Sequence, residues 1–237
     1  MISLLYDKNI IATDFYPSYI NTYIEKDVRQ IKNIENLNSF SIFLQLCAGR
    51  IGQVLNITSL AVDAGISPNT AKAWLSVLET SYIIYFLQPY HKNLNKRIIK
   101  SPKLYFHDTG LACSLLGLED ATQVKTHYLK GALFENFIIN EFIKHRFNNG
   151  NRVNLYFWQS KTKKEVDLIY EVGGKQFLFE IKSGRTINEH FADNLFYWQK
   201  LTGTDSKYLH VIHGGDNSIK TSKANFISWK NMKEAIG

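Results

Sequence analysis

The stretch around Gly173-Gly174 constrains the fold of this 237-residue chain more than any other feature. Apolar and aromatic residues recur on both sides of the glycine pair, in two short runs at residues 166–170 and 177–182. Runs of this length and composition that flank two glycines are typical of a β-hairpin. The sequence therefore predicts two neighbouring antiparallel strands joined by a tight turn.

Further elements surround this hairpin in a regular order. The spacing of apolar residues predicts a helix from Gly131, strands at 153–158, 207–213 and 226–229, and a helix at 189–201. On the first helix, Asn136, Asn140 and Lys144 are expected to face solvent. The order α-β-β-β-α-β predicts a mixed α/β domain over residues 126–237. The apolar stripe of the first helix consists of Leu133, Phe134, Phe137, Ile138, Ile139, Phe142 and Ile143.

The N-terminal half has a different pattern, dominated by helices. Helical spacing over residues 16–28 predicts a helical lead-in within residues 1–34, and an apolar run predicts a helix over 37–49. Thr58 is the expected N-cap of a short helix over 58–64, and Ser67-Pro68 opens the next helix. Strands are predicted at 82–87 and 103–106. Helix, helix, helix and β-hairpin together predict a winged helix-turn-helix domain over residues 35–125.

The segment 107–130 contains the run Asp108-Thr109-Gly110-Leu111 and a predicted short apolar helix that ends near Gly117. We interpret it as a linker region. The polar residues 119–126 then predict a domain boundary between 120 and 130.

A winged helix offers two surfaces to DNA, its second helix and its hairpin. The second helix presents Asn69, Lys72 and Ser76. These surfaces are the predicted nucleic-acid contacts, and the alternative is a winged helix that packs against protein, with a solvated basic loop. The hairpin presents Lys92, Lys96, Arg97, Lys100 and Lys103.

The composition of the chain indicates which kinds of partner and which cellular location to expect. The balance of 28 basic and 21 acidic residues gives 28 − 21 = +7, with an isoelectric point near 9.2, which favours polyanions such as DNA. Two cysteines, Cys47 and Cys113, lack the spacing of a disulfide framework or a metal site, so we expect apolar packing roles. No apolar run has the length of a membrane helix and no signal peptide is evident, so we expect a cytoplasmic protein without membrane contact.

Acidic residues and a lysine on the predicted hairpin indicate a candidate metal-dependent catalytic site. Residues two apart on a strand share a face, so Glu180 and Lys182 point the same way, as do Glu165 and Asp167. Carboxylates on adjacent strands can bind Mg²⁺, which activates a water, and a lysine can stabilise developing charge. Glu165 is either a ligand at the rim or an exposed strand charge, and exposure is the favoured interpretation.

This pattern resembles the restriction-endonuclease-like superfamily, whose signature is Asp…(Asp/Glu)-x-Lys in the same order of elements. The resemblance implies a PD-(D/E)XK fold of α/β/α type, with Asp167 and Glu180 as metal ligands and Lys182 as catalytic base or charge stabiliser. Glu135 matches the auxiliary acid on the preceding helix. The proline that usually precedes the first acid is replaced by Val166.

A second resemblance covers nearly the whole chain. Residues 23–28 (YIEKDV), 100–111 (KSPKLYFHDTGL), 131–136 (GALFEN) and 164–167 (KEVD) are similar to the C-terminal region of a family of prokaryotic AAA-type ATPases. That region is generally classed as a domain of unknown function. The resemblance implies an upstream ATPase module as partner. No G-x-x-x-x-G-K-[ST] loop occurs in this sequence, so ATP binding by this part alone is not expected.

Two functional hypotheses follow. In the first, the chain is the C-terminal part of an AAA-type ATPase and acts as a Mg²⁺-dependent DNA nuclease directed by the winged helix. In the second, the nuclease fold has no catalytic activity and serves as a DNA-binding or protein-interaction module that regulates the ATPase. The two hypotheses share the fold and differ in whether the cluster of Asp167, Glu180 and Lys182 cleaves.

Overall fold

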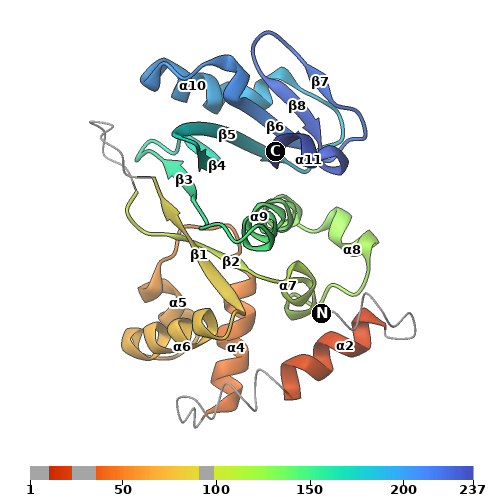
Figure 1. The fold of residues 1–237 in the computed structure, drawn as a ribbon. Coiled ribbons are helices and arrows are strands. Elements are labelled where there is room, and N and C mark those ends of the chain that lie inside the picture. Colours follow the sequence, from red (N-terminus) through yellow and green to blue (C-terminus); the bar gives the residue numbers. More distant parts are fainter. Residues whose placement is uncertain (1–10, 23–35, 91–98, 237) are drawn as a thin grey trace. The chain divides into compact units, whose positions relative to one another are not determined.

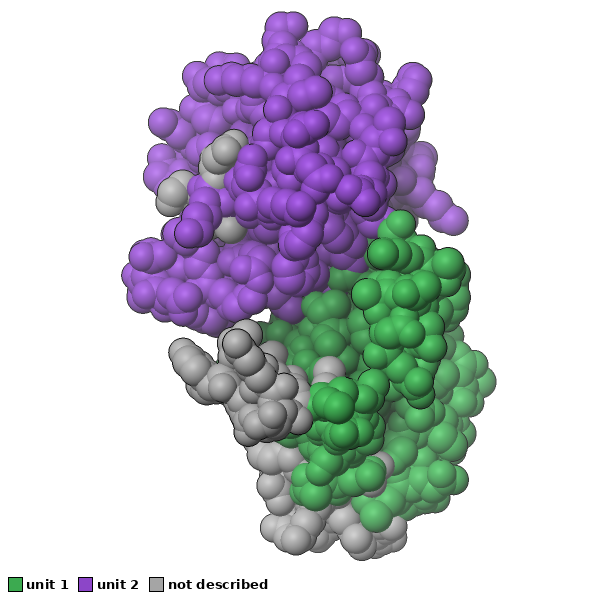
Figure 2. All heavy atoms as spheres, turned by 90° about the vertical axis from the view of Figure 1, so that its right-hand side faces the viewer, with its two compact units in different colours: residues 1–86, 103–133 green, residues 87–102, 134–237 purple. Residues whose placement is uncertain are grey.

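The structure is a computed structural model, and it describes residues 11–22, 36–90 and 99–236. The chain divides into two compact units (Figure 2). Unit 1 contains Met1–Phe86 and Lys103–Leu133, and unit 2 contains Leu87–Pro102 and Phe134–Gly237. The sequence analysis placed one boundary between 120 and 130, whereas the chain passes between the units at three points. None of the helices in the described ranges has both the length and the apolar character that crossing a bilayer requires.

Unit 1 is mostly helical. Its strands are the beginning of β1 (Ile84–Pro89) and β2 (Lys103–Phe106), which is the neighbour of β1 in the strand order. Its described helices are α2 (Ala12–Tyr19), α4 (Leu37–Ala48), α5 (Ile57–Asp63), α6 (Pro68–Thr80), α7 (Thr109–Leu115) and α8 (Ala121–Thr126), labelled in Figure 1.

Polar caps fix where the helices of unit 1 begin. The side chain of Ser67 accepts a hydrogen bond from the backbone amide of Thr70 at 3.0 Å, as the sequence predicted. The predicted cap of α5 was wrong, because Asn56 and not Thr58 caps it, accepting from the amide of Ser59 at 3.0 Å. An asparagine two residues earlier starts the helix sooner than the threonine would.

The core of unit 1 is aromatic. The ring of Trp74 on α6 makes edge contacts with Phe40 and Phe43 on α4, at centroid distances of 5.2 and 5.3 Å. Cys47 on α4 is fully buried, as predicted, whereas Cys113 on α7 is half-buried. Burial, with Asp108 as a second cause, raises the pKa of the Cys113 thiol to about 11.

The segment predicted as a linker is folded. Asp108 caps α7 by accepting hydrogen bonds from the amides of Gly110 and Leu111 at 2.8 and 3.3 Å. Leu111 and Ala112 are buried in unit 1. The predicted short helix is therefore confirmed, but the linker interpretation was wrong, because the helix packs into unit 1.

Unit 2 is a mixed α/β unit, which confirms the predicted class. Its elements are α9 (Lys130–Asn148, from Phe134 onward), β3 (Leu155–Gln159), β4 (Glu165–Val172), β5 (Lys175–Lys182), α10 (Asp193–Thr202), β6 (Leu209–His213), β7 (Ile219–Lys220), β8 (Asn225–Ser228) and α11 (Lys233–Ile236). The strand order is β1-β3-β4-β5-β6-β8-β7. Strand β4 is antiparallel to both of its neighbours, β3 and β5. Strands β5, β6 and β8 run parallel to one another, and the end of β1 runs parallel to β3.

The predicted hairpin is confirmed. Strands β4 and β5 pair from Val172 and Lys175 at the turn to Leu168 and Phe179, and both glycines of the turn have positive φ, 57° and 74°. Figure 1 shows α9 on one face of the sheet and α10 on the other. On the α9 side Phe142 packs against Phe179 at a centroid distance of 4.9 Å.

The expected solvent-facing side of α9 is partly wrong. Lys144 is exposed, but Asn136 is 0 % and Asn140 6 % exposed. A helix with an apolar stripe as wide as that of α9 is covered on more than one side, so polar residues next to the stripe become buried as well.

The pairing of β3 with β4 contains a bulge. Trp158 pairs with Val166 and Tyr156 with Ile169, so two steps along β3 match three steps along β4. Val166 and Ile169 therefore both reach the core cluster that contains Trp198, although strict alternation would put them on opposite faces. The extra residue falls within 166–169, around Asp167.

Candidate functional site

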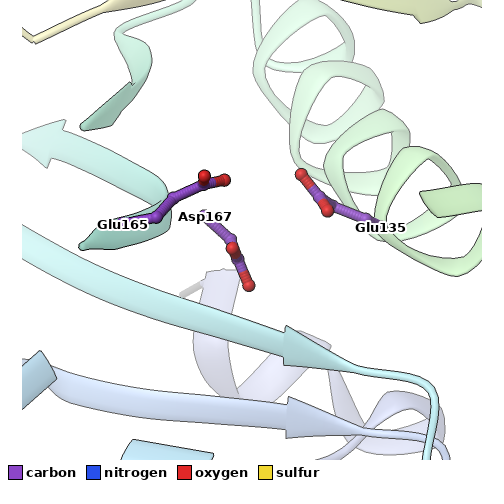
Figure 3. A group of neighbouring side chains, drawn as sticks. All are labelled: Glu135, Glu165 and Asp167. Carbon is purple, nitrogen blue, oxygen red and sulfur yellow. The ribbon is translucent and has the colours of Figure 1, made fainter. Parts of the chain in front are cut away.

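Three carboxylates from two elements of unit 2 converge (Figure 3). Glu135 comes from α9, and Glu165 and Asp167 come from β4. One oxygen of each lies within 4.8 Å of an oxygen of the other two, which is close enough for one metal ion to bind all three. Glu135 and Glu165 are half-buried and Asp167 is 7 % exposed. We call Glu135, Glu165 and Asp167 the acid group.

Backbone contacts hold Asp167 at the centre of this arrangement. Its Oδ2 accepts a hydrogen bond from the amide of Ile181 at 2.8 Å, so the side chain of β4 is tied to the neighbouring strand β5. The Nζ of Lys182 lies 3.3 Å from the same oxygen. Bulges often occur next to active sites, where they aim a side chain, and the bulge in β4 surrounds Asp167.

The next acid, Glu180, is fully buried and paired with Lys182. The Nζ of Lys182 lies 2.5 Å from Oε2 of Glu180, while Oε1 of Glu180 has no hydrogen-bond partner among the described residues. Burial, and then the charge of Asp167, raise the pKa of Glu180 well above its usual value. Burial opposes the charge of Lys182, but Asp167 and Glu180 outweigh it and raise the pKa of the lysine.

Glu165 differs from its favoured interpretation as an exposed strand charge. It is half-buried, and the side-chain amide of Gln159 donates a hydrogen bond to it across the β3–β4 pair. Its alternation with Asp167 placed both acids on one face, which was compatible with a ligand but did not distinguish a ligand from an exposed charge. The structure therefore brings Glu165 into the acid group beside Asp167 and Glu135.

The other predicted site residues lie elsewhere or outside the described residues. Asn69 and Lys72 are exposed on α6 in unit 1. Lys100 is exposed in unit 2, and Lys103 is 3 % exposed in β2 and so is not available to DNA. The predicted contacts Lys92, Lys96 and Arg97 lie outside the described residues.

The residues present suit a hard divalent cation. All donors of the acid group are carboxylate oxygens, which Mg²⁺, Mn²⁺ and Ca²⁺ prefer over the nitrogen and sulfur ligands that softer metals select. A buried carboxylate oxygen without a partner, such as Oε1 of Glu180, is costly unless a cation or water satisfies it. The three carboxylates of the acid group lie beside the single ammonium group of Lys182, so the local charge balance also favours a cation.

Comparison with known proteins gives the family. A family model described as a domain of unknown function (DUF8612) matches residues 4–122, just over half of the 237 residues. The chain belongs to the DUF8612 family. A second model, also described as a domain of unknown function (DUF4143), matches residues 130–232. In this DUF8612 member the acid group, Glu180 and Lys182 all fall within the second match.

Similar full-length proteins are longer than the DUF8612 chain. An uncharacterized protein of Mycobacterium bovis and one of Mycobacterium tuberculosis are each 30 % identical to it over 168 residues. The match covers 71 % of this chain and 37 % of each relative, so the chain spans well under half of their length. No solved structure matches the DUF8612 chain. The expectation that the sequence falls among domains of unknown function is confirmed.

Proposed function

We propose that unit 2 is a metal-dependent phosphodiesterase that acts on DNA, with the acid group as its cation site. The observation that carries this proposal is the convergence of Glu135, Glu165 and Asp167 within 4.8 Å, next to the buried pair Glu180 and Lys182. A bound Mg²⁺ or Mn²⁺ would supply charge neutralisation at a phosphate and a water of lowered pKa.

Each residue has a role in this proposal. Glu135, Glu165 and Asp167 hold the cation, and Oε1 of Glu180 is a further oxygen available to it or to one of its waters. Lys182 is positively charged at neutral pH, since Asp167 and Glu180 outweigh the effect of burial and raise its pKa. Since the lysine side chain is 33 % exposed, its ammonium group can reach a phosphate oxygen and stabilise negative charge there.

The order of elements supports a PD-(D/E)XK type of fold for unit 2. A helix that carries an acid precedes the antiparallel strands β3, β4 and β5, and β6 then adds parallel to β5 after α10. This is the order that the resemblance to the restriction-endonuclease-like superfamily implies. For unit 1 we retain the winged helix as a proposal, supported by the succession of α4, α5, α6 and two strands. The greater length of the mycobacterial relatives leaves room for the proposed upstream ATPase module.

One observation favours the second hypothesis, a nuclease fold that binds without cleaving. Lys182 contacts both Asp167 and Glu180, at 3.3 and 2.5 Å, and so already neutralises part of their charge. An ion pair of this kind can be purely structural. In this case unit 2 binds DNA or a protein partner and regulates the module upstream.

Cleavage assays with matched variants test the proposal. Supercoiled plasmid, single-stranded and branched DNA are incubated with the protein and Mg²⁺ or Mn²⁺, using the wild type, Asp167→Asn, Glu135→Gln and Glu141→Gln. Glu141 also lies on α9 but pairs with Lys144 outside the acid group, so its variant controls for the loss of one helix carboxylate. We expect cleavage by the wild type and by Glu141→Gln only. Equal background cleavage by the wild type and Asp167→Asn would reject the enzyme.

Cation binding is measured separately from cleavage. Electron paramagnetic resonance reports bound Mn²⁺, and Asp167→Asn and Glu135→Gln should weaken its binding at least about tenfold, whereas Glu141→Gln should not. Mn²⁺ binding by the acid group without cleavage of any DNA would favour the regulatory hypothesis. Absence of both would reject the metal site.

A further inference from the structure

A loop rich in lysine leads directly into the acid group. Residues 160–164 connect β3 to β4 with the sequence Ser-Lys-Thr-Lys-Lys, and the next residue is Glu165. Lys161, Lys163 and Lys164 are all exposed. Within the parts of the chain that the structure describes, none of the three forms an ion pair, although Glu165 is their neighbour.

Hydrogen bonds give this loop a defined shape. The amide of Ser160 donates to the carbonyl of Lys164 at 2.8 Å, and the amide of Lys163 donates to the carbonyl of Ser160 at 3.0 Å. The hydroxyl oxygen of Ser160, a residue only 6 % exposed, accepts from the amide of Lys164 at 3.1 Å. A buried serine therefore anchors the turn, and the lysine side chains extend from a fixed backbone.

The backbone of Lys163 has φ of 61°, in the left-handed region. Glycine or asparagine adopts this conformation at lower cost than lysine does. The hydrogen bonds of the turn impose the conformation, and the position nevertheless carries a long cationic side chain. Strained residues of this kind concentrate at binding and active sites, which is a reason to look for a ligand here.

A fourth lysine joins from a distant part of the sequence. The amide of Ile99 donates to the carbonyl of Gln159 at 3.1 Å, which fixes the chain before exposed Lys100 beside the end of β3. Gln159 is also the residue whose side chain donates to Glu165. Lys100 and the three loop lysines thus gather at the end of β3 and the beginning of β4, where the acid group lies. We call these four residues the basic loop cluster.

We propose that the basic loop cluster binds the sugar-phosphate backbone of a nucleic acid strand beside the acid group. The choice of ligand rests on the proposed function, because a phosphodiesterase site flanked by ammonium groups fits a polymer of phosphates better than a single phosphate. A lone phosphate needs only the acid group with its cation and Lys182. Four further cations on the adjoining loop and chain can neutralise successive phosphates of a strand, and counterion release then favours binding.

Two triple variants test this binding site. Lys161, Lys163 and Lys164 are changed to Ala in one, and Lys175, Lys220 and Lys223 in the other. The control lysines are also exposed, but they lie at the opposite ends of the strands, near the starts of β5 and β8. Both variants therefore lose three positive charges, so any difference between them reports position and not net charge.

Binding is measured by fluorescence anisotropy of labelled single-stranded and duplex DNA, in EDTA and in Ca²⁺, over a range of KCl concentrations. We expect the loop triple to raise Kd at least about tenfold. Its salt slope should fall by about 2 to 3, since each lost phosphate contact removes about 0.7 to 0.9. The control triple should change Kd less than about threefold. Unchanged Kd in the loop triple, or equal losses in both triples, would overturn the proposal.

Two further arms separate this inference from its alternatives. Vesicles containing phosphatidylserine offer anionic lipid headgroups, and binding to them that depends on the loop lysines as strongly as DNA binding does would overturn the choice of nucleic acid. Cleavage of the same DNA by the wild type and both triple variants is measured in parallel with Mg²⁺ or Mn²⁺. If neither the wild type nor any variant cleaves DNA but the loop triple still loses binding, the proposed enzyme fails while the binding site stands.

Discussion

The hydroxyl of Tyr16 on α2 donates to both carboxylate oxygens of Asp108, at 3.1 and 3.0 Å, although the two residues are 92 positions apart. Asp108 is also the N-cap of α7, so one carboxylate starts one helix of unit 1 and holds another against it. Burial, and then Asp108, raise the pKa of Tyr16 well above its usual value, so the phenol remains a donor. The Asp-Thr-Gly-Leu run thus has a structural role.

Asp108→Ala should lower the free energy of unfolding by about 2 to 3 kcal/mol, because it removes a helix cap and leaves the half-buried Tyr16 hydroxyl without its acceptor. Tyr16→Phe removes the hydrogen bond but keeps the cap, and should cost about 1 kcal/mol. Urea denaturation followed by circular dichroism measures both. A cost for Asp108→Ala that does not exceed that of Tyr16→Phe would contradict the double role.

Gly110→Ala should displace α2. A Cβ at Gly110 would lie 2.2 Å from the hydroxyl oxygen and 2.6 Å from Cζ of Tyr16, far inside contact distance. We expect a loss of at least about 2 kcal/mol, as overpacking usually costs 1 to 3 kcal/mol. Gly131→Ala on α9 is the matched control, since nothing lies within 4 Å of its added Cβ, and it should be neutral or slightly stabilising. In a Tyr16→Ala background, Gly110→Ala should lose its effect on the melting temperature; persistence of the full effect would point to another cause.

Lys182→Met should destabilise unit 2. It removes the ammonium group from Oε2 of Glu180, a carboxylate with 0 % exposure whose other oxygen already has no partner. Leaving a buried polar group without its partner costs about 1 to 3 kcal/mol. Because the lysine is partly exposed, we expect the free energy of unfolding to fall by about 2 kcal/mol. The double variant with Glu180→Gln should recover most of the loss in urea denaturation. Stability equal to wild type in Lys182→Met would show that the pair is not coupled.

His210 should make the protein sensitive to acid. Burial lowers its pKa from the ordinary 6.5 to about 4, and its buried Nε2 has no partner among the described residues. Because the pKa in the folded protein is below that of the unfolded chain, the unfolded chain binds the proton first as the pH falls. The contribution of neutral His210 to the free energy of unfolding is therefore fully present above pH 6.5. It declines as the pH falls to about 4, by roughly 3 kcal/mol at most.

His210→Gln should flatten this decline, as measured by unfolding at pH values between 7 and 4, the interval that spans the two pKa values. The exposed His190 provides the control, and His190→Gln should retain the slope of the wild type. A slope in His210→Gln that equals the wild type would assign the acid sensitivity to other groups.

Local signals in the sequence predicted much of unit 2. The glycine pair at 173–174 and the alternation around Asp167 were enough for the hairpin, because a two-residue turn and pleating are local properties. The cap at Ser67 was likewise local. These features need no knowledge of distant parts of the chain. Glu135 was assigned through the resemblance to the restriction-endonuclease-like superfamily, and it lies close to Asp167 in the acid group.

Features that depend on distant contacts were missed. The burial of Asn136 and Asn140 follows from what packs around α9, and the link from Tyr16 to Asp108 joins segments far apart in sequence. The membership of Glu165 in the acid group depends on how β4 lies against α9, so alternation alone could not separate ligand from exposed charge. The bulge around Asp167 likewise needed the register with β3.

The pairing of β1 with β3 decides which residues a fragment must contain for unit 2 to fold. Gln88 and Pro89 pair with Tyr156 and Phe157, and the amide of Tyr90 donates to the carbonyl of Phe157 at 2.7 Å. A protein fragment that starts at residue 134, or that follows the match over 130–232, would lack this strand. Strand β3 would then become an edge strand with unpaired backbone groups, which favour aggregation. Unit 2 is therefore discontinuous in sequence, and a fragment or gene fusion that keeps its fold has to include residues 87–102 as well as 134–237.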